Sequence, residues 1–201
     1  MNISKKFALI SILALATSCV ETVIVGSFAT GSVVTREKTA VDTKDDVIIA
    51  TKLYAEFVQN GLKNVGENVD ITVNEGRVLL TGVVRDQKKQ KLAVDLAWRV
   101  DDKVKEVINE VDFVNESLSP KDISRTFADY FLIIEIEAKF LARSGVSSTN
   151  YKITVVDGVV YLIGIASDKR ELDYALDIVA KTRGVKRVVN YVILKNDSRR
   201  R

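Results

Sequence analysis

Apolar, glycine and aspartate positions follow the same order twice along the chain, which indicates an internal repeat. Most matched positions lie 82 residues apart. In the first copy they are Ile71, Val73, Gly76, Val78, Leu80, Gly82 and Asp86, and in the second Ile153, Val155, Gly158, Val160, Leu162, Gly164 and Asp168. The segment 104–109 recurs as 185–190, one residue closer. The pattern predicts two copies of one small fold.

The spacing of apolar residues predicts the elements of each copy. Ile49, Leu53 and Phe57 lie four residues apart, which indicates one stripe of an amphipathic helix. Asp86 is the residue type that favours a helix N-cap. The elements predicted for the first copy are a helix over 46–60, strands over 69–73 and 77–84, a helix over 86–100 and a strand over 104–113.

The connections between these elements predict the topology. The short turn at 74–76 makes the first two strands an antiparallel hairpin, and the crossover through a helix makes the third strand parallel to the second. We therefore predict an α+β fold of two tandem domains. Each domain follows the order αββαβ and has a three-stranded mixed sheet covered on one face by two helices. Gly82 and Gly164 interrupt apolar strands, so we predict a bulge or a close approach of helix and sheet there.

The polar segment 115–119 separates the two copies, and Pro120 with Asp122 resembles the start of a helix that extends to about residue 144. The predicted boundaries are a signal peptide over 1–18, a lipidated tether over 19–44, a first domain over 45–114, a linker over 115–119, a second domain over 120–196 and a basic tail over 197–201.

The N-terminus has the parts of a bacterial signal peptide. Lys5 and Lys6 supply positive charge, and residues 7–16 form an apolar run too short to span a bilayer. Residues 15–19, Leu-Ala-Thr-Ser-Cys, resemble the lipobox of bacterial lipoproteins, although Ala16 stands where that motif usually has leucine. We predict that Cys19 carries the lipid. The alternative is an incidental cysteine near an ordinary cleavage site.

The residues after Cys19 help to predict which membrane of the envelope holds the protein. Val20 follows the cysteine, whereas an aspartate there favours inner-membrane retention in lipoproteins of well-studied bacteria. The resemblance therefore implies a lipid-anchored protein of the outer membrane that faces the periplasm. The apolar segment 20–34 is short and contains Gly26 and Gly31, so we interpret it as a tether close to the bilayer and not as a span.

The amino-acid composition argues against several classes of function. The 30 basic residues nearly balance the 27 acidic ones, so no broad basic field for nucleic acid is expected. Histidine is absent and there is one cysteine, which removes the commonest general base and any multi-cysteine zinc site. We also find no Gly-x-Ser-x-Gly motif. The sequence predicts a non-enzymatic protein without cofactor or metal.

The order and duplication of these motifs resemble the BON (bacterial OsmY and nodulation) domain family. The residues that carry the resemblance are Asp46, Gly76, Gly82, Asp86 and 104–111, repeated as Asp129, Gly158, Gly164, Asp168 and 185–192. With the lipobox, the chain is similar to the dual-BON-domain outer-membrane lipoproteins of the DolP type. That resemblance implies a role in outer-membrane integrity and binding of anionic phospholipid through the first helix of the second domain.

The predicted helix after Pro120 permits such a role, because it carries two apolar stripes. Leu132, Ile136 and Phe140 match the core stripe of the first domain, and the opposite side holds Phe127, Tyr130, Phe131, Ile134 and Leu141. The corresponding side of the first helix has smaller residues and no phenylalanine. A second stripe requires another partner. We assign these five residues as the candidate phospholipid-binding site.

Two other partners for this second stripe remain open. The stripe packs against the other domain or a second protomer in one alternative. In the other it docks an envelope protein, and the chain is then a periplasmic adaptor. Arg125, Lys139 and Arg143 lie near enough on the helix to meet lipid phosphates, although helical charges are more often solvated. For Arg199, Arg200 and Arg201 a disordered, solvated tail is the favoured interpretation.

Overall fold

The computed structural model describes residues 40–64, 67–114 and 120–200, and side chains are described outside 40–41 and 120–125. All of these residues belong to one compact unit, Val34–Arg201. The predicted signal peptide, the lipid attachment at Cys19 and the linker lie outside the described residues, as does most of the tether.

The first domain follows the predicted order with one addition. Its sheet has the order β1-β2-β3-β4, in which β2 and β3 are antiparallel and β3 and β4 are parallel. The added β1 is a two-residue strand that pairs with the start of β2. The elements are α1 (Ala40–Gln59), β1 (Lys63–Asn64), β2 (Glu67–Asn74), β3 (Arg77–Val84), α2 (Gln87–Arg99) and β4 (Glu106–Phe113).

The second domain repeats this architecture with a three-stranded sheet. Its strand order is β5-β6-β7, with β5 antiparallel and β7 parallel to β6. Short 3₁₀ turns precede β5 and follow β7. The elements are α3 (Pro120–Ala142), η1 (Ser148–Asn150), β5 (Tyr151–Val156), β6 (Val159–Ala166), α4 (Lys169–Ala180), β7 (Arg187–Leu194) and η2 (Ser198–Arg200).

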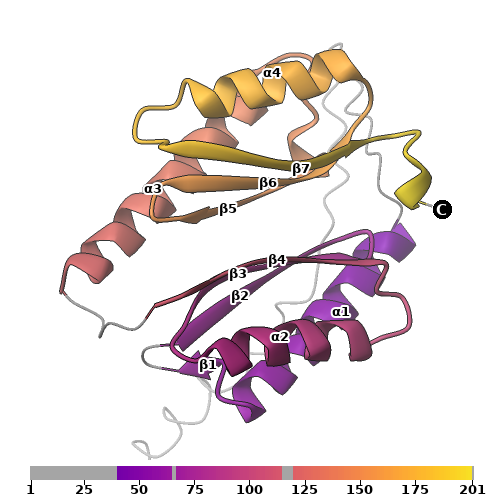
Figure 1. The fold of residues 1–201 in the computed structure, drawn as a ribbon. Helices are drawn as coiled ribbons and strands as arrows, with labels where there is room; N and C mark the ends of the chain where they lie inside the picture. Colours follow the sequence, from indigo (N-terminus) through magenta and orange to yellow (C-terminus); the bar gives the residue numbers. More distant parts are fainter. Residues whose placement is uncertain (1–39, 65–66, 115–119, 201) are drawn as a thin grey trace, which may run out of the picture. The chain divides into compact units, whose positions relative to one another are not determined.

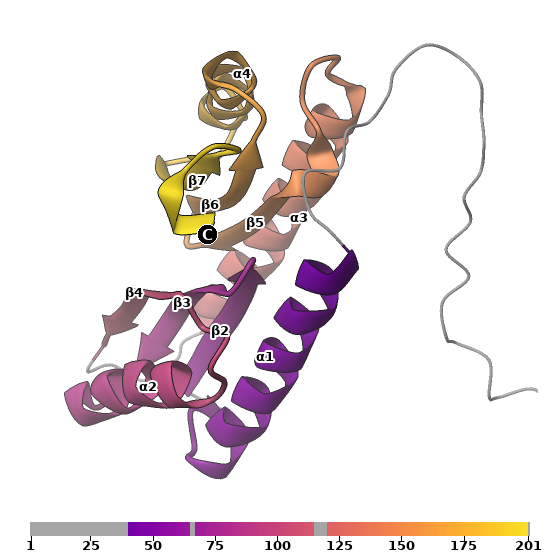
Figure 2. The ribbon, with the colours of Figure 1, turned by 90° about the vertical axis from the view of Figure 1, so that its right-hand side faces the viewer.

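In each domain both helices cover one face of the sheet (Figure 1). The first helix of each domain runs along the first long strand of its hairpin, α1 on β2 and α3 on β5 (Figure 2). The predicted α+β fold is therefore confirmed. Asp86 is also the N-cap of α2, as predicted, and its carboxylate accepts a hydrogen bond from the Lys88 amide at 2.8 Å.

Each domain has its own core between helices and sheet. Ile49, Leu53 and Phe57 of α1 are fully buried against β2, β3 and α2. In α3 the buried residues are Leu132, Ile136 and Phe140. The four-residue spacing thus placed the correct faces of both helices in the core, because burial selects one stripe of an amphipathic helix.

An aspartate inside the first helix of each domain holds the hairpin turn. Asp46 accepts hydrogen bonds from the Glu75 and Gly76 amides, both at 2.9 Å. Asp129 bonds the equivalent amides of Asp157 and Gly158 at 2.7 and 2.8 Å. Asp46 does not begin its helix, contrary to the helix predicted over 46–60, because α1 starts at Ala40, whereas α3 starts at Pro120 as predicted. Both aspartates bind the amides of a turn that would otherwise lack acceptors.

Replacing Asp129 with alanine is expected to lower the free energy of unfolding of the second domain by about 2–3 kcal/mol, because two charge-assisted hydrogen bonds are lost. Asparagine keeps one acceptor oxygen, and we expect it to lose about half as much. Urea denaturation followed by circular dichroism measures both. Asp173→Ala, which removes an exposed ion pair with Lys169, is the control and should cost less than about 0.5 kcal/mol. An Asp129→Ala protein as stable as this control would contradict the turn-holding role.

The glycines inside the apolar strands have a different role from the predicted one. A Cβ on Gly82 would lie 2.0 Å from the Asn68 carbonyl oxygen of β2, and one on Gly164 would lie 2.4 Å from the Asn150 carbonyl oxygen. The close approach is therefore between neighbouring backbones of the sheet and not between helix and sheet. Gly82 also has a φ of +101°, which glycine adopts without strain.

The two domains meet through the sheet faces that their helices leave open. Leu79 and Ile108 from the first domain form a buried cluster with Tyr161 and Ile163 from the second. Equivalent positions of the repeat face each other across this contact. For example, the hydroxyls of Thr72 and Thr154 are 3.0 Å apart. The Tyr191 hydroxyl likewise donates a hydrogen bond to the carboxylate of its counterpart, Glu110. The contact is thus approximately two-fold symmetric, like that of a homodimer.

One charged side chain breaks this symmetry. Arg77 is 1% exposed, and its equivalent in the second domain is Val159. Its Nε lies 2.5 Å from Glu106 Oε2, and one terminal nitrogen donates to the Tyr191 carbonyl at 2.8 Å. A buried guanidinium needs such partners, so Arg77 fixes one relative placement of β3, β4 and β7.

The Tyr191–Glu110 bond predicts a loss of stability at high pH. Burial and the hydrogen bond to Glu110 raise the pKa of Tyr191 to about 12. In the unfolded chain the phenol ionises near pH 10, so the free energy of unfolding should fall as the pH rises from about 10 to about 12. The Tyr191→Phe variant should lack this component of the pH dependence. Parallel stability curves for the two proteins over that range would contradict the prediction.

Candidate functional site

Helix α3 exposes the whole apolar stripe that the sequence identified. Phe127, Phe131 and Leu141 are 63%, 66% and 79% exposed. Tyr130 and Ile134 are also exposed, and the Tyr130 and Phe131 rings meet edge to face at 6.5 Å between centroids. At 1.5 Å per residue the stripe extends about 21 Å along the helix. These five residues form a continuous apolar surface, which we call the α3 stripe.

The opposite side of α3 supplies the domain core, so the domain does not need the α3 stripe for its own packing. Among the described residues the two domains meet through their open sheet faces, and the members of the α3 stripe stay exposed beside that contact. The alternative in which the α3 stripe packs against the first domain is therefore not what the structure shows. Exposed apolar residues that gather on one side of a helix often mark an interaction site.

Helix α1 offers a weaker version of this surface. Val47, Tyr54 and Val58 are exposed on it. The sequence predicted smaller residues without phenylalanine on this side, and the structure adds an exposed tyrosine, Tyr54. The position equivalent to Phe127 is Lys44, and the one equivalent to Ile134 is Thr51. Of the two equivalent helices, α3 therefore exposes more aromatic residues than α1.

Two of the cations predicted to meet lipid phosphates have partners in the structure. Lys139 Nζ lies 2.7 Å from Glu135 Oε1 and 3.1 Å from the Thr182 hydroxyl. The Arg143 guanidinium lies 4.4 Å from the centre of the Tyr174 ring. The side chain of Arg125 lies outside the described part. Both described cations flank the α3 stripe and do not belong to it.

The end of the chain differs from the favoured interpretation of a solvated tail. Arg200 forms two hydrogen bonds of 2.9 Å to the Glu75 carboxylate, which belongs to the turn of the first domain. Arg199 pairs with Asp197 at 2.7 Å. Only 18% of the Arg200 side chain is exposed, because the buried Glu75 carboxylate holds it. Arg199 and Arg200 thus have protein partners, and Arg201 lies outside the described residues.

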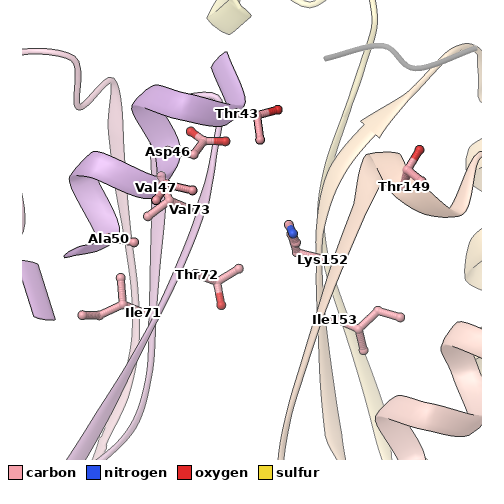
Figure 3. Close-up of a pocket in the computed structure, with 10 residues that line it drawn as sticks. All are labelled: Thr43, Asp46, Val47, Ala50, Ile71, Thr72, Val73, Thr149, Lys152 and Ile153. Carbon is pink, nitrogen blue, oxygen red and sulfur yellow. The ribbon is translucent and has the colours of Figure 1, made fainter. Parts of the chain in front are cut away.

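Two of the hollows that border these helices are relevant to the site. One, of about 340 Å³, lies beside Phe131 and is lined by Ala128, Asp129, Phe131, Leu132, Glu135, Asp157, Gly158, Arg183, Gly184 and Lys186. The other, of about 360 Å³, lies between β2 and β5. Figure 3 shows Thr72 and Lys152 pointing into the space between these strands, whereas Ile71 and Ile153 point away from it. The hollow beside Phe131 is the one that adjoins the α3 stripe.

The described residues hold no group of three or more Asp, Glu or Cys side chains arranged to bind a metal ion. In the same part of the chain, no helix has the length and apolarity to cross a bilayer. The α3 stripe therefore remains the candidate site, as an interaction surface.

The repeated αββαβ units and their glycines agree with a match to a known protein family. Residues 45–115 and 135–196 each match the profile of the BON domain, and together they make up more than half of the chain. The chain belongs to the BON domain family. The first match contains β1 to β4, α2 and all but the start of α1, and the second begins within α3 and contains β5 to β7 and α4, so each structural repeat of this protein is one BON domain.

Curated relatives agree with this assignment. A protein of Anaplasma centrale, described as an uncharacterized protein in the gshII 5' region, is 38% identical over 78% of this chain and 99% of its own length. The outer membrane lipoprotein DolP of Haemophilus influenzae is 29% identical over 85% of this chain and 86% of its own. The 21 kDa hemolysin of Actinobacillus pleuropneumoniae is 27% identical over 74% of this chain and 75% of its own.

Proposed function

We propose that this BON protein is a non-enzymatic lipoprotein of the outer membrane that binds anionic phospholipid through the α3 stripe and supports outer-membrane integrity. The observation that carries the proposal is the continuous exposure of Phe127, Tyr130, Phe131, Ile134 and Leu141 on a helix whose other side already fills the core. The similarity to the H. influenzae outer membrane lipoprotein supports the compartment. Cys19 would carry the lipid anchor, with the protein facing the periplasm.

The α3 stripe suits the interface of a bilayer. A helix that lies in the interface buries its apolar side shallowly and keeps its polar sides in water. Aromatic rings prefer the level of the headgroups, where Phe127, Tyr130 and Phe131 would sit. A protein held by a lipid on Cys19 stays near the membrane, so even a weak contact by α3 is occupied for much of the time.

Vesicle co-sedimentation tests the proposal. The fragment 20–201, which retains all described residues, is mixed with vesicles of phosphatidylglycerol and phosphatidylcholine or of phosphatidylcholine alone, at low and high salt. We expect binding to the anionic vesicles that weakens with salt, because headgroup charge is screened. No binding under any condition would contradict phospholipid recognition. Crosslinking in the envelope would then test whether the α3 stripe docks a protein, which is the adaptor alternative.

A further inference from the structure

Three cations of the second domain lie near the end of α4, two of them lining the hollow beside Phe131. Lys139 is on α3 itself, and its Nζ contacts the Thr182 hydroxyl at the end of α4. Arg183 and Lys186 belong to the loop between α4 and β7, and they line the hollow of about 340 Å³ that Phe131 also lines. We call these three residues the basic flank. The hollow thus brings cations and a ring of the α3 stripe together.

The first domain provides an internal comparison, because it has the same fold. The α1 and α3 positions align 83 residues apart, and the loops before β4 and β7 align 81 apart. By this alignment Lys139 corresponds to Glu56, Arg183 to Asp102 and Lys186 to Lys105. At these three positions the second domain has three cations, whereas the first domain has two carboxylates and one lysine. The basic flank is not required by the fold, and it occurs on the domain with the aromatic stripe.

The carboxylates around the hollow are already neutralised. Asp129 binds two backbone amides, and Asp157 pairs with Lys186 at 3.1 Å. Glu135 pairs with Lys139 at 2.7 Å. The Arg183 side chain, in contrast, is exposed and forms no hydrogen bond or ion pair with the described residues. Arg183 is therefore the cation beside this hollow that is available to a ligand.

We propose that the hollow receives the phosphodiester group of an anionic phospholipid, with Arg183 as its principal ligand. This inference rests on the proposed membrane contact of the α3 stripe. The guanidinium of an arginine can bind a phosphate through two parallel hydrogen bonds, whereas the ammonium of a lysine acts as a point charge. Phe131 lines the same hollow, so a lipid whose phosphate meets Arg183 would have its acyl chains beside the α3 stripe.

The Arg183→Gln variant tests this in the vesicle assay with the fragment 20–201. We expect binding to phosphatidylglycerol-containing vesicles to weaken about five- to tenfold at low salt, since one basic residue near an anionic surface contributes roughly this factor. Binding to phosphatidylcholine vesicles should be weak for both proteins, because the choline cation balances the charge of the phosphodiester. The matched control is Arg85→Gln, which removes an exposed arginine from the first domain and should change binding less than about twofold.

The outcomes separate this inference from the proposed function. If Phe131→Glu abolishes binding but Arg183→Gln and Arg85→Gln bind alike, the α3 stripe contacts lipid and the headgroup role of Arg183 is wrong. If the wild-type fragment binds no vesicles, the proposed function fails first, and this inference fails with it. Thermal unfolding of Arg183→Gln should match the wild type, because the side chain is exposed and has no protein partner among the described residues.

Discussion

Replacing Phe131 with glutamate should weaken binding to anionic vesicles by at least about a hundredfold and leave the fold intact. Withdrawing a phenylalanine side chain from an apolar environment costs about 1.5–3 kcal/mol. A carboxylate in its place must also be desolvated and is repelled by anionic headgroups. At about 1.4 kcal/mol per tenfold change in affinity, these effects together account for the expected loss.

The exposure of Phe131 makes this variant informative. Because 66% of the residue is exposed, the substitution removes little core packing, and the melting temperature should stay within a few degrees of the wild type. The matched control is Trp98→Glu, which changes an exposed aromatic residue on α2 of the first domain. It should bind vesicles like the wild type. Equal losses in both variants would mean that general surface hydrophobicity drives binding and the α3 stripe has no special role.

The largest expected effect on stability comes from Gly82→Ala, which should lower the free energy of unfolding of the first domain by at least about 3 kcal/mol. The new Cβ would overlap the Asn68 carbonyl oxygen at 2.0 Å, so β2 and β3 must move apart. The backbone φ of +101° adds strain for any residue with a Cβ. Urea denaturation of the fragment 20–201 measures the change.

Gly61→Ala separates the two causes. Gly61 also has a positive φ, of +66°, but a Cβ there would meet only the ends of the Asn64 and Lys89 side chains at 3.7 and 3.8 Å. This variant should therefore cost only the conformational strain, about 1–2 kcal/mol. If Gly82→Ala were no more destabilising than Gly61→Ala, the close approach of β2 to Gly82 would not be a constraint on the fold.

Comparison of the two repeats shows where the surfaces of the two domains differ. Both keep the same core stripe and the same aspartate that binds the hairpin turn. They differ on surfaces that the fold leaves free, where the second domain has Phe127 in place of Lys44 and Arg183 in place of Asp102.

The candidate site could be predicted from sequence only in part. The α3 stripe follows from helical periodicity, since a helix with one buried stripe must expose the other, and all five of its residues are exposed. Arg183 and Lys186 belong to a loop about fifty residues further along the chain. Aligning the loops of the two repeats would have shown their excess of positive charge, but not that they lie beside Phe131.

The sequence by itself determined the repeat, the order of the elements, the core stripes of α1 and α3 and the N-cap at Asp86. These features depend on residues close together in the chain, and the periodicities of helix and strand report them directly. Only the tertiary structure decided that Asp46 and Asp129 hold turns, that Gly82 faces a neighbouring strand, and that the two sheets meet around Leu79 and Tyr161. It also gave Arg77 and Arg200 their partners. These contacts join residues that are far apart in the sequence, and burial selects them only once the elements have packed.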